Sequence, residues 1–295
     1  MSNSPTIVTS RLLRDWQLPE PDTDEGKAGR GSVVVIGGAP HTPGAVLLTG
    51  LAALRVGAGK LTYATVEQNA SALAVAVPEA GVMALATTDT GALALSSRDT
   101  LGALVENADT VVLGPGMAGP EQTREFVSGL LPLLGANTTL VLDALGLTCG
   151  ALDAAAVRRL DGRVVITPNP TEAGILLDDD SGVDASGTSE ATTRRLANRF
   201  GAVAALRSTV ASPDGRMWQD GSGNPGLGTS GSGDVLAGAI GGLAARGASA
   251  EQAAVWGVHL HAEAGERLAA RIGAVGFLAR ELLDELPQVL DQLSR

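Results

Sequence analysis

The sequence has 295 residues, of which 44% are hydrophobic and 18% charged, and its formal net charge is −11. This length and apolar fraction suffice for one large α/β domain or two smaller ones. An acidic surface repels nucleic acids and anionic membranes, so neither is expected as a partner. Aromatic residues make up only 2% of the chain, which argues against a stacking platform for single-stranded nucleic acid.

The cysteine content and the N-terminus bear on the cellular setting. Cys149 is the only cysteine, which excludes an intrachain disulfide framework and fits a reducing, cytoplasmic compartment. The N-terminus lacks the basic and apolar regions of a signal peptide. Every long apolar window is interrupted by Gly, Pro, Arg or Lys. We therefore predict a soluble cytoplasmic protein without a membrane segment.

The first half of the sequence alternates short β-branched runs with longer Ala- and Leu-rich stretches. The runs predict strands at 32–36, 61–65, 110–113, 139–142 and 164–167. Helices are predicted at about 44–56 and 68–77, and each later strand also leads into a helical pattern. Continuous apolar strands that alternate with amphipathic helices indicate a parallel sheet covered on both faces.

After Phe200 the pattern changes. We predict strands at 202–210 and 216–219, with Asp214-Gly215 as a hairpin turn between them. Helices are expected near 233–246, 250–272 and 276–286, and the acidic stretch 178–189 predicts a surface loop. No internal repeat and no long linker divides the chain, so one domain is predicted.

A loop of small residues, Gly228-Thr-Ser-Gly-Ser-Gly-Asp234, opens the helix predicted after residue 232. Backbone N–H groups at such a helix start are unpaired, and with the helix dipole they form an anion site. Glycine allows a phosphate to approach closely and permits positive φ. Asp234, in the first helical turn, stays ionised and can take a proton from a hydroxyl that attacks a phosphoryl group. The alternative is a plain turn with a capping aspartate.

Two other positions fall where ligands bind in open α/β folds, at the carboxyl ends of strands. Asn169 and Glu172 follow the strand predicted at 164–167, and prolines fix that turn. The alternative is a capping turn in which Asn169 or Thr171 starts a helix. Asp143 closes the strand at 139–142 and is predicted either to contact a metal or ligand, or to act only as a cap.

Several other functional classes are disfavoured. The glycine loop matches neither the Walker pattern nor the dinucleotide-binding fingerprint. His259 and His261 are two residues apart in a predicted helix, so they face different sides and do not form a metal pair. Ser232 lacks a G-x-S-x-G context and an evident histidine partner, which argues against a hydrolase triad. His41 lies in a Gly/Pro turn from which it could reach a ligand.

A series of segments in chain order carries a resemblance to a known enzyme family. They are Gly31-Ser-Val-Val-Val-Ile-Gly-Gly38, residues 43–59, Leu113-Gly-Pro-Gly-Met117, Leu142-Asp-Ala144, residues 167–172, residues 224–238 and residues 276–287. Together they resemble the ATP/ADP-dependent NAD(P)H-hydrate dehydratases of the ribokinase-like superfamily, over roughly residues 28–288.

The resemblance implies a ribokinase-like α/β fold: a mostly parallel central sheet with helices on both faces, in a single domain. Residues 1–27 would form an N-terminal helix and a lead-in segment, and residues 28–295 the catalytic domain. It also implies repair of NADHX and NADPHX, in which the reduced nicotinamide ring carries a hydroxyl. ADP or ATP phosphorylates that hydroxyl, and loss of phosphate restores the ring double bond. Mg²⁺ and a homo-oligomer, a tetramer in the family, are further implications.

Matching positions assign roles by resemblance. Asp234 is the implied catalytic base and also contacts the substrate. The anion hole for the nucleotide phosphate is Ser230, Gly231, Ser232 and Gly233. The other implied substrate contacts are Ala45, Gly116 and Asn169. The nucleotide-contacting segment is Arg207, Ser208 and Thr209. Asp143 and Glu172 remain candidate metal or ligand contacts.

The chain departs from the family pattern at four positions. The family usually has histidine at the place of Asn169, glycine at that of Thr171, an acid at that of Leu145 and lysine at that of Arg207. Arg207 keeps the charge, but its planar fork differs from an ammonium group. Two alternative functions follow: a kinase for a sugar or vitamin-like alcohol, and a nucleotide-binding protein without catalysis.

Overall fold

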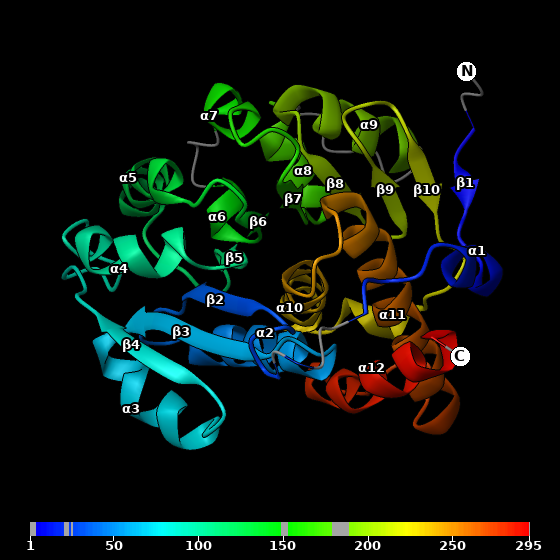
Figure 1. Cartoon of the computed structure of the whole chain (residues 1–295), viewed down its shortest axis with the longest axis horizontal. Helices are drawn as coiled ribbons and strands as arrows, with labels where there is room; N and C mark the ends of the chain where they lie inside the picture. The colour runs from blue at the N-terminus through cyan, green and yellow to red at the C-terminus, as the bar shows by residue number, and fades with distance from the viewer. Residues whose placement is uncertain (1–3, 21–23, 25, 149–152, 179–188, 295) are drawn as a thin grey trace.

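The computed structural model describes residues 4–20, 24, 26–148, 153–178 and 189–294 (Figure 1). These form a ten-stranded sheet in the order β1-β10-β9-β8-β7-β6-β5-β2-β3-β4. Neighbouring strands are parallel except for β9, which is antiparallel to β8 and β10. The strands are β1 Thr6–Ile7, β2 Ser32–Gly37, β3 Lys60–Val66, β4 Gly81–Leu85, β5 Thr110–Leu113, β6 Thr139–Leu142, β7 Val164–Ile166, β8 Val203–Leu206, β9 Thr209–Ala211 and β10 Met217–Gln219.

Two helical layers cover the sheet. One face packs against α1 (Ser10–Asp15), α2 (Pro43–Arg55), α3 (Glu67–Ala76), α10 (Ser232–Ala245), α11 (Ala250–Arg271) and α12 (Ala279–Ser294). The other packs against α4 (Ser97–Glu106), α5 (Pro120–Leu130), α6 (Leu145–Thr148), α7 (Ala154–Arg158), α8 (Pro170–Leu176) and α9 (Ser189–Phe200). Short 3₁₀ turns lie at Leu131–Leu133 and Pro225–Gly228. In Figure 1, α10, α11 and α12 lie together beside α2.

The central strands are apolar on both sides because both faces are covered. Along β2, Val33 and Val35 join the core under α2 and α10, whereas Val34 and Ile36 join the core under α4 and α5. Side chains alternate between the faces of a strand, so a strand buried on both faces reads as a continuous apolar run. The fold class predicted from sequence is confirmed.

The predicted elements agree with the structure over most of the chain. The strands expected before residue 170 match β2, β3, β5, β6 and β7 within one residue at each end, and the Asp214-Gly215 hairpin joins β9 to β10. The helices expected at 233–246 and 250–272 are α10 and α11. The helix expected at 276–286 instead begins at Ala279 and continues through Pro287 to Ser294.

One strand prediction was wrong, and two strands were not predicted. The single strand expected at 202–210 is two antiparallel strands, β8 and β9, because the chain reverses at Arg207, whose φ is 54°. The short edge strands β1 and β4 were not predicted. The first has only two residues, and the second contains Gly81 and Ala84, residue types of low β-propensity.

The N-terminal segment joins the rest of the molecule. β1 pairs with β10, Leu13 is fully buried in the core, and Trp16 stacks on Trp218 with ring centroids 5.8 Å apart. The domain boundary after residue 27 stays a prediction. Cys149 and most of the surface loop predicted at 178–189 lie outside the described residues. Over the part of the chain that is described, no helix is long and apolar enough to cross a membrane.

Candidate active site

The start of α10 has the geometry of an anion site. Its N-cap, Gly231, has φ 90°, a left-handed conformation that favours glycine. The N–H of Ser232 donates to Thr229 O at 3.2 Å, and that of Val235 donates to Gly231 O at 3.1 Å. The N–H of Gly233 meets no acceptor among the described residues. An unpaired donor at the positive end of a helix is suited to bind a phosphate oxygen.

Gly231 also fixes where the loop lies. A Cβ at this position would be 2.6 Å from Leu48 Cδ1 of α2 and 3.9 Å from Asp234 Oδ2. A larger residue would have to displace the end of the Leu48 side chain and would be strained by the positive φ. The glycine loop is therefore packed against α2, which begins just beyond the carboxyl end of β2.

Three carboxyl groups from different elements share this region. Burial raises the pKa of Asp234 to about 6, and the negative charge of Glu172 adds to the rise. Burial also raises the pKa of Asp143 to about 7; the Thr167 hydroxyl, 2.8 Å from Asp143 Oδ1, opposes the rise, and the charges of Asp234 and Glu172 reinforce it. The pKa of Glu172 is raised by burial and held back by the backbone N–H of Asn169. The site thus favours a proton or a cation.

The buried charge of Asp143 should affect the stability of the fold. Its native pKa, about 7, lies above its ordinary value of 3.8, so the ionised group destabilises the native state at neutral pH, and this penalty disappears at low pH where the group is protonated. Asp143→Asn keeps an oxygen for the Thr167 hydroxyl and removes the charge. We expect its melting temperature to exceed the parent's at pH 8. The difference, followed by thermal unfolding, should shrink as the pH falls from 7 towards 4.

The matched comparison is the acid at the opposite edge of the sheet, Glu106, which is exposed. Glu106→Gln also removes one negative charge, but at a solvent-exposed position. It should change the melting temperature little at any pH, since exposed charges contribute little to stability. An Asp143→Asn variant that is less stable than the parent at pH 8 would contradict the account of a destabilising buried charge.

Asn169 caps helix α8. Its side-chain oxygen accepts the N–H of Glu172 at 2.9 Å, and the Glu172 carboxylate accepts the N–H of Asn169 at 2.8 Å, which makes a reciprocal capping box. The capping alternative weighed from the sequence is therefore confirmed. A substrate contact by the exposed Asn169 side chain stays a prediction, and the cap leaves its amide nitrogen for that contact.

Ala45 and Gly116 lie side by side. A Cβ on Gly116, whose φ is 65°, would be 2.9 Å from Ala45 Cβ and 2.6 Å from Thr42 O. The Thr42 hydroxyl donates to Gly116 O at 2.7 Å, which ties the loop after β2 to the loop after β5. Asp143, which follows β6, lies close enough to Asp234 for the charge of Asp234 to raise its pKa. These contacts bring Asp234 and Gly116 to the same carboxyl edge of the sheet, as predicted.

The turn at Arg207 lies at this edge too, since β8 runs parallel to β7. Gln219 binds the two residues that follow Arg207: its Nε2 donates to Ser208 Oγ and its Oε1 accepts from Thr209 Oγ1, each at 2.7 Å. The exposed Arg207 guanidinium has no partner among the described residues. The side chains of Ser208 and Thr209 thus hold the turn, and Arg207 is the one available to a ligand.

Ser232 has a histidine partner that the sequence did not reveal. Its hydroxyl lies 2.9 Å from His261 Nε2, and both side chains are buried. Burial lowers the pKa of His261 to about 4, so the imidazole is neutral. The expectation that Ser232 lacks a histidine partner was wrong. The two residues are 29 positions apart, so the local sequence around Ser232 does not reveal the pair. Because the Ser232 hydroxyl is buried and hydrogen-bonded to His261, its role is to stabilise the glycine loop.

His259 faces elsewhere, as its spacing from His261 predicted. Its Nδ1 lies 2.6 Å from Asp220 Oδ2, and this pair is buried. Burial opposes ionisation of Asp220, but the hydrogen bond and charge of His259 outweigh it and lower the pKa of Asp220. The pair anchors the end of β10 to α11, just before the glycine loop.

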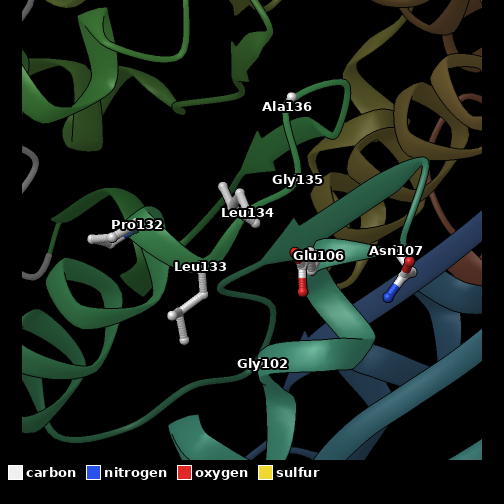
Figure 2. A pocket seen from close by; sticks show the side chains of 8 residues that line it. All are labelled: Gly102, Glu106, Asn107, Pro132, Leu133, Leu134, Gly135 and Ala136. Atoms are coloured by element: carbon white, nitrogen blue, oxygen red, sulfur yellow. The ribbon is translucent and has the colours of Figure 1, made fainter.

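A pocket elsewhere has no comparable chemistry. Figure 2 shows it between the end of α4, with Glu106 and Asn107, and residues 132–136. Both segments precede the amino ends of β5 and β6, on the edge opposite Asp234. The Asn107 amide already donates to Ala103 O. This pocket is not part of the candidate active site.

The fold is that of a ribokinase-like protein, and this edge of the sheet carries a helix start suited to an anion with a carboxylate nearby. The profile of the NAD(P)H-hydrate dehydratase family matches residues 33–288. An ADP-dependent (S)-NAD(P)H-hydrate dehydratase of Xanthomonas campestris is 44% identical, and the alignment covers 98% of this chain and 97% of the relative. The chain belongs to the NAD(P)H-hydrate dehydratase family.

Other relatives agree. A bifunctional NAD(P)H-hydrate repair enzyme of Moorella thermoacetica is 35% identical; the match covers 97% of this chain but 54% of that protein, so the chain spans about half of its length. Among solved structures, an ADP/ATP-dependent NAD(P)H-hydrate dehydratase from Bacillus subtilis, co-crystallised with ATP and Mg²⁺, has a TM-score of 0.80 and 26% identity, covering 98% of this chain and 99% of that one.

Proposed function

We propose that this chain uses ADP or ATP to dehydrate hydrated NADH and NADPH, and so returns the damaged cofactors to use. One observation carries the proposal: a carboxylate, Asp234, follows an unpaired N–H at a helix start and lies on the edge that also bears Ala45 and Gly116. The family to which the chain belongs supports the choice of substrate.

The chemistry follows from these groups. Asp234, ionised above about pH 6, takes the proton of the ring hydroxyl as its oxygen attacks the terminal phosphorus of the nucleotide. The oxygen–phosphorus bond to the donor breaks, and the N–H of Gly233 stabilises the charge on the transferring group. The new phosphate ester then loses inorganic phosphate from the ring, a proton leaves the neighbouring carbon, and the ring double bond is restored.

Mg²⁺ is part of the proposal. Within the described residues, no three His, Cys, Asp or Glu side chains are grouped to hold a metal ion by themselves. Magnesium, however, commonly binds one or two carboxylates and completes its shell with water and substrate phosphates. Asp143 and Glu172, whose pKa values are raised chiefly by burial, would supply those carboxylates, and the ion would neutralise phosphate charge.

Arg207 is proposed to contact the nucleotide. Arg207→Ala removes an exposed cation from a turn that Gln219 holds through Ser208 and Thr209, so the fold should be kept. We expect calorimetric titration to show ADP and ATP binding about tenfold weaker, since a charge-assisted hydrogen bond contributes about 1.5–3 kcal/mol. Arg207→Lys is the charge-keeping control. Unchanged affinity of Arg207→Ala for both nucleotides would remove Arg207 from the site.

The remaining parts of the proposal concern organisation. Residues 28–295 would form the catalytic unit, working in the cytoplasm as a homo-oligomer, a tetramer by family resemblance. Sedimentation of the purified chain tests the assembly directly.

The experiment that tests the function uses NADHX and NADPHX with Mg²⁺ and either ADP or ATP. Absorbance of the restored dihydronicotinamide should rise only when a nucleotide is present. The competing activity, a kinase for a sugar or vitamin-like alcohol, would leave NADHX unchanged and yield a stable phosphate ester. Nucleotide binding without any turnover would support a non-catalytic relative.

A further inference from the structure

A second pocket lies at the carboxyl edge, beyond the positions proposed to bind the nicotinamide nucleotide. Its volume is about 340 Å³, and it lies between the start of α3 and the loops that follow β2, β4 and β5. Its polar lining consists of His41, Thr42, Gln68, Thr88, Asp89 and Thr90. Neither the glycine loop nor Arg207 borders it.

A continuous series of contacts joins this pocket to the catalytic aspartate. Gly231 lies beside Asp234 and packs on Leu48, which is three residues, about one helical turn, beyond Ala45 on α2. Ala45 contacts Gly116, and Gly116 O accepts the hydroxyl of Thr42, which lines the pocket. A dinucleotide with its nicotinamide end at Asp234 would therefore extend past Ala45 and Gly116 towards this pocket.

The walls of the pocket are held by hydrogen bonds. On one side the buried Asn69 amide donates to Ala39 O at 2.8 Å, and the Ala39 N–H donates to Thr42 Oγ1 at 3.2 Å. On the other side Gln68 Nε2 donates to Thr87 Oγ1 at 3.0 Å, and the hydroxyls of Thr88 and Thr90 lie 2.9 Å apart. A site whose walls are already bonded needs little ordering when a ligand enters.

The charge of the lining selects among ligands. Among the described residues that line the pocket, Asp89 carries the one carboxylate, and none is lysine or arginine. A carboxylate accepts hydrogen bonds from the two hydroxyls of an unmodified adenosine ribose, whereas a 2′-phosphate is usually met by arginine. Placing a phosphate beside an unpaired carboxylate is unfavourable, because like charges brought together in a binding site repel.

We infer that this pocket takes the adenosine ribose of the hydrated dinucleotide and that Asp89 makes the enzyme prefer NADHX to NADPHX. The inference rests on the proposed function. It gives Asp89 a specificity role in binding, with no part in the proton transfer at Asp234.

The test compares kcat/KM for NADHX and NADPHX at saturating nucleotide. We expect the parent to favour NADHX by about tenfold or more, which corresponds to about 1.4 kcal/mol. Asp89→Arg should reduce or reverse that preference, chiefly by raising kcat/KM for NADPHX, and Asp89→Asn should reduce it to a smaller extent. Glu106→Arg makes the same charge change at the opposite edge and should keep the parent preference.

Hydrated nicotinamide mononucleotide, which has no adenosine, separates ribose recognition from chemistry. Its kcat/KM should be equal in the parent and both Asp89 variants. Equal use of NADHX and NADPHX by the parent, or an unchanged preference in both variants, would overturn the inference. An equal change in kcat/KM for hydrated nicotinamide mononucleotide in the Asp89 variants would also overturn the inference, because Asp89 would then affect the chemistry or the folding. If the parent converts none of the three substrates, the proposed function itself fails.

Discussion

Replacing Asp234 by asparagine is expected to lower turnover by at least about a hundredfold, the loss typical of removing a positioned general base. Nucleotide binding should persist, because the proposed phosphate site of the glycine loop consists of backbone donors. Asparagine serves at a helix start about as well as aspartate, so a purely capping role for Asp234 predicts normal activity. Turnover within a few-fold of the parent would end the case for a catalytic base.

The same variant should be more stable than the parent at neutral pH. The native pKa of Asp234, about 6, exceeds its ordinary value of 3.8. The ionised carboxylate therefore destabilises the native state above about pH 6, and this penalty is lost at low pH. Asp234→Asn removes it. A variant that loses turnover while its melting temperature at pH 8 rises would separate catalysis from folding in one protein.

Gly233→Ala is expected to have the second large effect, lowering kcat/KM by about a hundredfold, comparable to the loss of one oxyanion-hole donor. The added methyl group has no neighbour within 4 Å in the free protein, and alanine is favoured over glycine inside a helix by about 0.5–1 kcal/mol. The fold should therefore be kept or slightly stabilised. The methyl group would instead occupy the space through which a phosphate reaches the N–H of Gly233.

Gly102→Ala is the matched control, since Gly102 lies in α4 at the opposite edge of the sheet and a Cβ there also meets nothing within 4 Å. It should leave kcat/KM unchanged. Calorimetric titration of Gly233→Ala with ADP and ATP should show weakened binding of both. Normal activity and normal nucleotide affinity in Gly233→Ala would exclude this N–H from the phosphate site.

The sheet and its helices could be predicted because burial on both faces leaves a direct mark in the sequence. The runs that became β2, β5 and β6 are continuously apolar, and glycine or proline turns bound them. The reversal at Arg207 left no such mark, since β8 and β9 read as one apolar run and the turn between them contains no glycine or proline. β1 escaped prediction because two residues carry no periodicity.

The candidate site was predictable where it depended on local sequence. The glycine loop and Asp234 are adjacent in the chain, and their geometry follows from the start of a single helix. The capping box of Asn169 and Glu172 is also local, and the sequence indicated both a capping turn and a ligand contact as alternatives there. Only the hydrogen bonds in the structure showed that the turn is a cap.

Long-range pairs could not be predicted. Thr167 binds Asp143 across 24 residues, and His261 binds Ser232 across 29 residues. The His259–Asp220 pair is likewise formed only when α11 packs beside the end of β10. The raised pKa of Asp143 depends on burial and on charges from two other elements, so no pattern in the neighbouring sequence reports it.

In the proposed reaction, the nucleotide phosphorylates the ring hydroxyl and that phosphate is then lost. The most direct measurement is the stoichiometry of a single reaction with NADHX and ADP or ATP, with dihydronicotinamide absorbance and inorganic phosphate recorded together. We expect one inorganic phosphate released for each NADH restored, and neither product in Asp234→Asn at the same enzyme concentration and time. Consumption of nucleotide with a phosphorylated product that accumulates, and no NADH formed, would contradict it and favour a kinase.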